Sequence, residues 1–131
     1  WISPEYKNNV EEEINFIINI KNHLETDKRN KMVITHYSFL ATILNENYFS
    51  SAIGYPNDGT GYPLKRNKFA TNYKNLIVNN IKKNKIEIIY IIHPIKKESL
   101  YDYINEACFE EKIIFENLNS YKLLKCSDLN N

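Results

Sequence analysis

The sequence predicts an α/β fold: a small Rossmann-like three-layer sandwich with a three- to four-stranded, mostly parallel sheet. Short β-branched runs alternate with longer segments in which apolar residues recur at helical spacing. Strands that alternate with helices are typical of α/β proteins with a parallel central sheet. The length of 131 residues fits one domain, and the apolar and charged fractions of 43% and 25% are ordinary for a folded domain.

The N-terminal part of the chain predicts a helix followed by a strand. Apolar residues recur at helical spacing over residues 5–24, and the glutamates at 11–13 suit the positive end of the helix dipole. The predicted apolar face consists of Val10, Ile14, Ile17, Ile18 and Leu24. We assign residues 1–30 to this amphipathic helix, which would follow a membrane helix outside the chain. Residues 31–131 form the α/β domain, beginning with a strand at 31–35.

The middle of the chain predicts a helix, a long loop and a second helix. Ser38 is expected to cap a helix that carries Phe39, Leu40, Ile43 and Leu44. Residues 45–64 hold all three glycines and two of the four prolines, which predicts a loop of about twenty residues. Loops of that length are usually functional or disordered. The next helix is expected at residues 67–84.

The C-terminal part predicts a strand, a helix and an ambiguous tail. Residues 86–92 are nearly all apolar, as in a strand buried on both faces. A third helix is expected around residues 100–107. In one interpretation of the tail, residues 112–116 pair antiparallel with residues 121–125 through a turn at 117–120. In the other, only the second of these segments is a strand.

The state of the two cysteines depends on that choice. The hairpin places Cys108 and Cys126 at its open end, where a disulfide would close a loop of about 19 residues and contribute roughly 3 kcal/mol in the chain-entropy model. Such a bond requires an oxidising compartment. In the alternative, Cys126 lies at the far end of a parallel strand, and both thiols stay free as small apolar side chains.

Two histidines follow the two strands, and this suggests a binding crevice. If the strands are parallel neighbours, the histidines lie at the carboxyl edge of the sheet, where open α/β sheets bind ligands. The predicted ligand-binding residues are His36, Tyr37, Tyr55, Asp58, Tyr62, Arg66 and His93. Such a crevice suits a phosphate or a sugar, because tyrosine rings stack on sugar faces and still form hydrogen bonds. Alternatively, the histidines only cap backbone carbonyls.

Other patterns argue against several functions. The segment 57–61 contains an Asp-Gly turn but lacks the Gly-Lys-Ser/Thr of a phosphate-binding loop. GxSxG, HExxH and CxxC motifs are absent, so we predict no catalytic residue, no metal site and no cofactor. The net charge of +1 gives no case for a nucleic-acid partner. The cluster Lys82, Lys83 and Lys85 suits a helix C-terminus, with contact to anionic lipid as the alternative.

Several stretches together resemble a known family. They are KMVITHYSFLATIL at 31–44, GYPLK at 61–65, YKNLI at 73–77, IEIIYIIHP at 86–94, CF at 108–109 and LKC at 124–126. The resemblance covers nearly the whole chain from Lys31 onward. The stretches resemble the soluble C-terminal domain of multi-spanning membrane glycosyltransferase-like proteins of marine bacteria. Those proteins are similar to the dolichyl-phosphate-mannose-protein mannosyltransferase group.

This resemblance implies a parent enzyme that transfers a sugar from a polyprenyl-phosphate donor, with its catalytic carboxylate in a membrane part that the chain does not contain. The chain would be a non-catalytic accessory domain on the extracytoplasmic (periplasmic) face of the bacterial inner membrane. Trp1 would lie in the aromatic belt just past the last membrane helix. The expected partners are the membrane-embedded remainder of the parent chain and a lipid-linked sugar or its acceptor. Two other classes stay open: a free-standing α/β binding module for a nucleotide or phosphorylated sugar, and a structural interaction domain.

Overall fold

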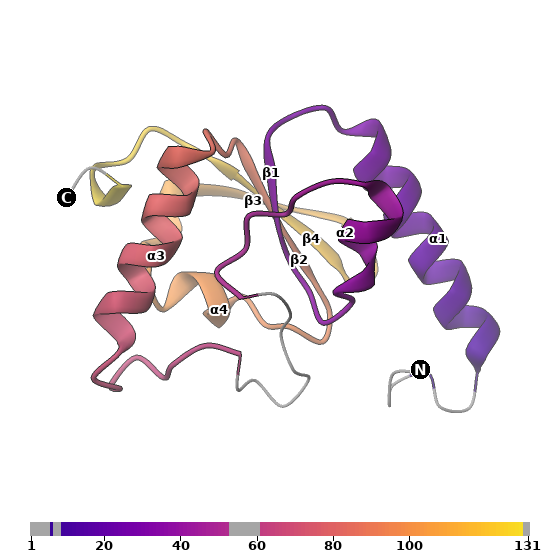
Figure 1. Cartoon of the computed structure of the whole chain (residues 1–131), viewed down its shortest axis with the longest axis horizontal. Helices are drawn as coiled ribbons and strands as arrows, with labels where there is room; N and C mark the ends of the chain where they lie inside the picture. The colour runs from indigo at the N-terminus through magenta and orange to yellow at the C-terminus, as the bar shows by residue number, and fades with distance from the viewer. Residues whose placement is uncertain (1–5, 7–8, 53–60, 130–131) are drawn as a thin grey trace.

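The computed structural model describes residues 6, 9–52 and 61–129 and shows a four-stranded sheet between helices (Figure 1). The strands are β1 (Lys31–Ile34), β2 (Ile88–Ile92), β3 (Phe109–Phe115) and β4 (Leu118–Leu123). The helices are α1 (Val10–Thr26), α2 (Phe39–Leu44), α3 (Ala70–Lys83) and α4 (Glu98–Tyr101). The predicted α/β class is confirmed.

The prediction of a mostly parallel, Rossmann-like sheet was wrong, because the sheet is mixed. Its strand order is β1-β2-β4-β3, and only β1 and β2 are parallel, with Lys31 opposite Ile88. β4 pairs antiparallel with both β2 and β3. A parallel neighbour needs a long crossover connection, whereas β3 and β4 are joined by a two-residue turn that reverses the chain at once. Asn117 in that turn has φ 69°, a left-handed conformation that asparagine tolerates better than most residues.

The hairpin interpretation of the tail holds, with a different register. β3 begins at Phe109 and the turn comes at Glu116 and Asn117, so Lys112 lies opposite Ser120. The helix expected around residues 100–107 is shorter than predicted. It divides into α4 and a 3-10 turn at Glu106–Cys108, which begins where the Asn105 side chain accepts a hydrogen bond from the backbone of Ala107.

Helix α1 presents a different face to the sheet from the one predicted. Its buried apolar side chains are Phe16, Ile20 and Leu24. Three side chains that we expected to be buried are 42%, 50% and 46% exposed: Val10, Ile14 and Ile18. The helix carries two apolar stripes, one with Ile14 and one with Phe16. The Phe16 ring packs edge-on against the rings of Tyr37 and Phe115, so the stripe with Phe16 faces the sheet. α1 therefore belongs to the same core as the sheet.

The two faces of the sheet form two apolar clusters. Successive strand residues point to opposite faces, so Ile89 and Ile91 pack in one cluster with residues of α3 and α4. Ile88, Tyr90 and Ile92 pack in the other cluster with residues of α1 and α2. All five residues of β2 are buried, as predicted for a strand covered on both sides. In the described ranges, no helix is both long enough and apolar enough to cross a bilayer.

Candidate functional site

The carboxyl edge of the parallel pair carries both predicted histidines. Because β1 and β2 are adjacent and parallel, His36 and His93 follow their strands at the same edge of the sheet. His93 is exposed, whereas His36 is partly buried, and its ring centroid lies 3.8 Å from that of Tyr37. Ligand binding at this edge stays a prediction.

Two of the other predicted residues lie on opposite faces of the sheet. Tyr37 is buried beside α1, where its hydroxyl donates a hydrogen bond to the Glu13 carboxylate at 3.0 Å. Tyr62 packs against the cluster beneath α3, near the rings of Tyr73 and Tyr103. Tyr37 therefore ties α1 to the segment after β1, and the structure does not place it with Tyr62.

The remaining predicted residues add little to a crevice. Arg66 is exposed in the segment that precedes α3. Tyr55 and Asp58 lie outside the described residues.

A hydrogen-bonded network that the sequence analysis missed lies beside the N-terminal end of β1. Tyr90, in the middle of β2, is fully buried, and its hydroxyl donates to Oδ2 of Asp27 at 2.6 Å. Nε2 of His23 lies 3.2 Å from the same hydroxyl, and the Arg29 guanidinium holds both oxygens of Asp27 at 2.9 and 2.8 Å. The His23 ring packs edge-on against the rings of Tyr90 and Phe115.

The network has defined protonation states. Burial favours the neutral form of Asp27, but hydrogen bonds from Arg29 and Tyr90 outweigh that effect and lower its pKa to about 2. Burial lowers the pKa of His23, against the opposing effect of Asp27. Burial also raises the pKa of Tyr90, and its hydrogen bond to Asp27 acts in the same direction. At neutral pH the carboxylate is therefore charged while the imidazole and the phenol are neutral.

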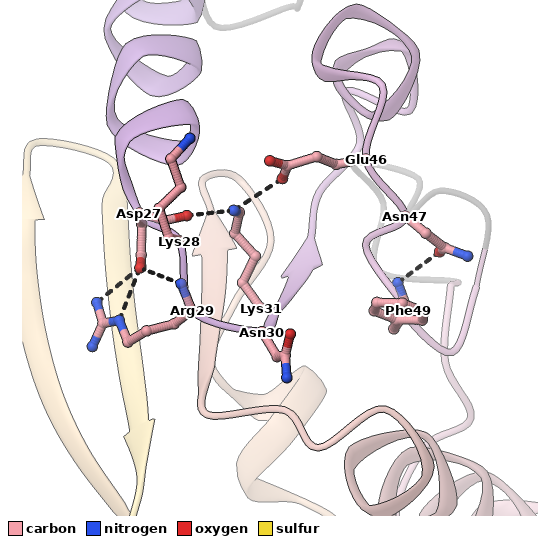
Figure 2. A pocket seen from close by; sticks show the side chains of 8 residues that line it. All are labelled: Asp27, Lys28, Arg29, Asn30, Lys31, Glu46, Asn47 and Phe49. Carbon is pink, nitrogen blue, oxygen red and sulfur yellow. Dashed lines mark hydrogen bonds and ion pairs between the residues drawn. The ribbon is translucent and has the colours of Figure 1, made fainter.

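Next to this network lies a pocket of about 260 Å³ at the start of β1 (Figure 2). Its lining comes from residues 27–31, between α1 and β1, and from Glu46, Asn47 and Phe49. Lys31 stands at its centre and is only 6% exposed. The ammonium of Lys31 donates to the Asp27 carbonyl at 2.7 Å and pairs with Oε2 of Glu46 at 2.9 Å. A carbonyl and a carboxylate thus both face this buried side chain, as is usual for a buried lysine.

The far wall of this pocket has a constrained backbone. Phe49 has φ 52°, which is uncommon for a bulky residue. Its N–H donates to Oδ1 of Asn47 at 3.0 Å, and its carbonyl accepts from the Asn80 amide of α3 at 3.1 Å. Val33 of β1 also donates to the Tyr48 carbonyl at 3.2 Å, so this wall is bound to the edge of the sheet. These contacts fix the position of the Phe49 backbone.

A second pocket, of about 350 Å³, lies on the other side of the same wall, against α2. It shares Asn47 and Phe49 with the first pocket, and its lining includes five hydroxyl side chains, those of Thr35, Ser38, Thr42, Tyr48 and Ser50. No charged side chain of the described residues lines it. Of the two, the pocket at Lys31 therefore offers the stronger polar recognition.

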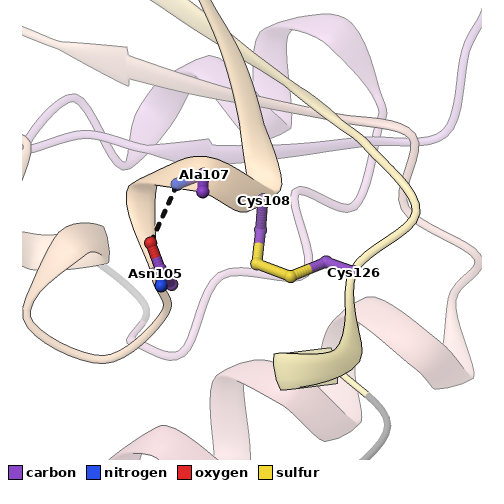
Figure 3. The surroundings of a disulfide bond; sticks show 4 residues. All are labelled: Asn105, Ala107, Cys108 and Cys126. Carbon is purple, nitrogen blue, oxygen red and sulfur yellow. Dashed lines mark hydrogen bonds between the residues drawn. A yellow bond between two sulfur atoms is a disulfide. The ribbon is translucent and has the colours of Figure 1, made fainter.

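The structure joins Cys108 and Cys126 in a disulfide (Figure 3), and their Cα atoms lie 5.3 Å apart. The bond connects the start of β3 to the segment that follows β4. Backbone hydrogen bonding supports the same contact, because Leu124 donates to the Cys108 carbonyl at 2.9 Å. Cys108 is buried in the cluster beneath α3, and Cys126 packs against that cluster. The C-terminal segment is thereby held to the core.

In the part of the chain that the structure describes, no group of three or more His, Cys, Asp and Glu side chains is placed to hold a metal ion. The polar and aromatic groups that the described residues bring together are a paired lysine and carboxylate, an aromatic wall and a buried tyrosine network.

Comparisons of the chain with family models, with curated proteins and with solved structures found no match.

Proposed function

We propose that this chain is an extracytoplasmic accessory domain of a polyprenyl-phosphate-sugar-dependent membrane glycosyltransferase and is not itself catalytic. The observation that carries the proposal is the disulfide between Cys108 and Cys126. Structural disulfides persist in oxidising compartments and are rare in reducing ones. The bond thus supports the periplasmic placement that the sequence resemblance implies.

The geometry of the polar groups favours binding over catalysis. Tyr90 is fully buried, so a substrate does not reach its hydroxyl without rearrangement of the domain. The Asp27 carboxylate is held by Arg29 and Tyr90 and has a strongly lowered pKa, which makes it a poor proton acceptor. The Lys31 ammonium is paired with Glu46, which makes it a poor nucleophile. Groups held in this way orient a ligand rather than react with it.

In this role the domain seats the acceptor, or the sugar of the lipid-linked donor, over the membrane-embedded active site of the parent chain. The partners are that membrane part and the sugar-bearing molecule. We place such a molecule at the binding edge predicted from His36 and His93 or in the pocket at Lys31.

A second candidate function is a free-standing α/β module that binds a phosphorylated sugar. The pocket at Lys31 favours it through the sugar ring of such a ligand, because a preformed pocket does not require a membrane partner. The two candidates differ in what is joined to the domain, and not in how the pocket is built.

The genomic reading frame upstream of Trp1 separates them. The accessory-domain proposal predicts several apolar segments of about 20 residues in the same frame, each long enough to span a bilayer. A start codon directly before Trp1 would contradict that proposal and favour the free-standing module.

A further inference from the structure

The pocket at the start of β1 combines a buried cation and a carboxylate with hydrogen-bonding capacity left over. An ammonium has three N–H donors, and two acceptors among the described residues face that of Lys31. Glu46 uses Oε2 in the pair and keeps Oε1 as an acceptor, and its side chain is 33% exposed. The pocket therefore offers a charged donor and a charged acceptor side by side.

This pairing matches a hydroxyl-bearing ligand better than an ion. A hydroxyl group both donates and accepts, so one hydroxyl can accept from Lys31 while its neighbour donates to Glu46. Hydrogen bonds to charged partners are roughly twice as strong as neutral ones. A free anion would approach Lys31 and Glu46 together and would be repelled by the carboxylate.

Phe49 supplies the apolar part of the site. It lines the pocket, and the bonds to Asn47 and Asn80 hold its backbone. Small-molecule pockets commonly join an apolar wall to a few placed polar groups. The apolar face of a sugar ring suits an aromatic wall of this kind, and its hydroxyl groups would then be directed to Lys31 and Glu46.

The volume limits the ligand to one ring. Pockets for drug-sized ligands are roughly 300–1,000 Å³, and the pocket at Lys31 is about 260 Å³. The wall at residues 47–49 separates it from the second pocket, so a longer saccharide would extend outward.

We propose that this pocket binds a single sugar ring, with Lys31 and Glu46 bonding adjacent hydroxyl groups and Phe49 forming the stacking wall. The inference deepens the proposed function, since it names a sugar as the ligand of the accessory domain. It does not depend on that function for its test, because the chain itself is titrated without a membrane partner.

The test is a titration of the ¹⁵N-labelled chain, followed by the backbone amide signals. The probes are D-glucose, D-mannose and N-acetyl-D-glucosamine, with inorganic phosphate at matched ionic strength as the comparison. We expect saturable shifts at Asn30, Asn47 and Phe49 with at least one of the sugars, and no such shifts with phosphate. Millimolar affinity is expected for one ring in an open pocket.

Two variants locate the binding, and one variant serves as a control. Glu46→Gln removes the charge and keeps the shape, and Phe49→Leu removes the ring. Each is expected to weaken binding about tenfold or more. Glu110→Gln changes an exposed carboxylate on β3 and should leave the affinity unchanged. All three are chosen at side chains that are not fully buried, so we expect the variants to fold, and the amide spectrum of each variant checks this.

Three results would overturn the inference. The first is the absence of saturable shifts with all three sugars. The second is saturable shifts with phosphate alone, which would identify an anion site. The third is unchanged affinity in both Glu46→Gln and Phe49→Leu. Any of these would leave the accessory-domain proposal standing if the upstream membrane segments are found, so the two failures are distinguishable.

Discussion

Strand β2 is buried along all five of its residues, whereas β3, at the far edge of the same sheet, is exposed at four of its seven. β2 lies between β1 and β4 and is covered on both faces by helices. β3 pairs only with β4, and its exposed residues include Glu110, Glu111 and Lys112. Charged side chains on an edge strand reduce edge-to-edge association.

The difference shows two ways of fixing a strand in one sheet. Full burial of a large aliphatic side chain contributes about 1.5–3 kcal/mol, so the apolar run of β2 stabilises its own position. The exposed part of β3 has no such contribution. Its place depends on the tight turn at Asn117, on pairing with β4 and on the Cys108–Cys126 bond. Substitutions in the two strands should therefore have very different effects.

The largest expected effect is that of a charge placed in β2, compared with the same charge placed in β3. Ile89→Asp puts an unpaired carboxylate at a position that is 0% exposed, and we expect the chain to unfold. Such a charge costs several kcal/mol against a total stability of about 5–15 kcal/mol. Ile113→Asp, at a position 70% exposed on β3, should change the stability by less than about 1 kcal/mol. Circular dichroism and thermal melts compare the two, and a folded Ile89→Asp chain would show that the core lies elsewhere.

Loss of the disulfide should have the next largest effect. The bond closes a loop with a sequence separation of 18, which corresponds to about 3 kcal/mol in the chain-entropy model. Urea unfolding of the Cys108→Ser, Cys126→Ser double variant should show a loss of that order. Hydrogen exchange should show the faster opening confined to β3, β4 and the C-terminal segment. An equal increase of hydrogen exchange in β1 and β2 would contradict the idea that β3 is stabilised separately from the parallel strands β1 and β2.

Tyr90→Phe tests the buried hydrogen-bonded network beside the parallel strands β1 and β2. The variant removes the hydroxyl that bonds Asp27 at 2.6 Å and His23 at 3.2 Å, and we expect a loss of about 1–3 kcal/mol. The matched change in the other half is Tyr101→Phe, whose hydroxyl bonds the exposed Glu111 at 3.2 Å. That loss should be smaller, because both groups regain water contacts. A larger loss of stability in Tyr101→Phe than in Tyr90→Phe, measured by urea unfolding, would contradict the greater weight given to the buried network.

The pH dependence of stability should come from the same network and be the smallest effect near neutrality. The pKa of His23 is lowered in the folded state, so its contribution is complete above the ordinary value of 6.5 and declines as the pH falls below it. The pKa of Asp27 falls from 3.8 to about 2 on folding, so its contribution, at most about 2 kcal/mol, is lost between those values.

Chemical denaturation between pH 7 and pH 2 should therefore show stability that decreases as His23 and then Asp27 take up protons. Below the ordinary Asp27 value of 3.8 the slope should be shallower in Tyr90→Phe, which loses one of the hydrogen bonds that lower the pKa of Asp27. An identical slope in the wild type and in Tyr90→Phe would place the acid sensitivity elsewhere.

Local patterns in the sequence predicted the parallel strands β1 and β2 and the helices α1 and α3. They predicted the sheet topology and the buried face of α1 less well. The apolar runs of β1 and β2 predicted strands, and the helical spacing predicted α1 and α3, because these signals come from neighbouring residues. The choice of the Phe16 stripe over the Ile14 stripe on α1 depends on rings supplied by Tyr37 and Phe115. The mixed sheet depends on the antiparallel pairing of β4 with β2, which no local pattern predicts. The hairpin turn lies at residues 116–117 and not at the predicted 117–120.

The candidate sites show the same division. Two strand-end histidines predicted a shared edge, and the parallel pairing of β1 and β2 gives them one. The network at Tyr90 and the pocket at Lys31 join segments that are far apart in the sequence. The only local signals were a tyrosine within an aliphatic strand and a lysine at the start of a buried one. Without the tertiary contacts, neither residue identifies its partners.

The oxidation state of the two cysteines in the protein from its natural cell tests the central claim most directly. The measurement is alkylation of free thiols under denaturing conditions, with and without prior reduction, followed by mass spectrometry of the peptides that contain Cys108 and Cys126. An extracytoplasmic domain stabilised by this bond predicts no alkylation before reduction and two alkylated cysteines after it. Two cysteines alkylated without reduction would contradict the extracytoplasmic placement and remove the stabilisation assigned to the hairpin.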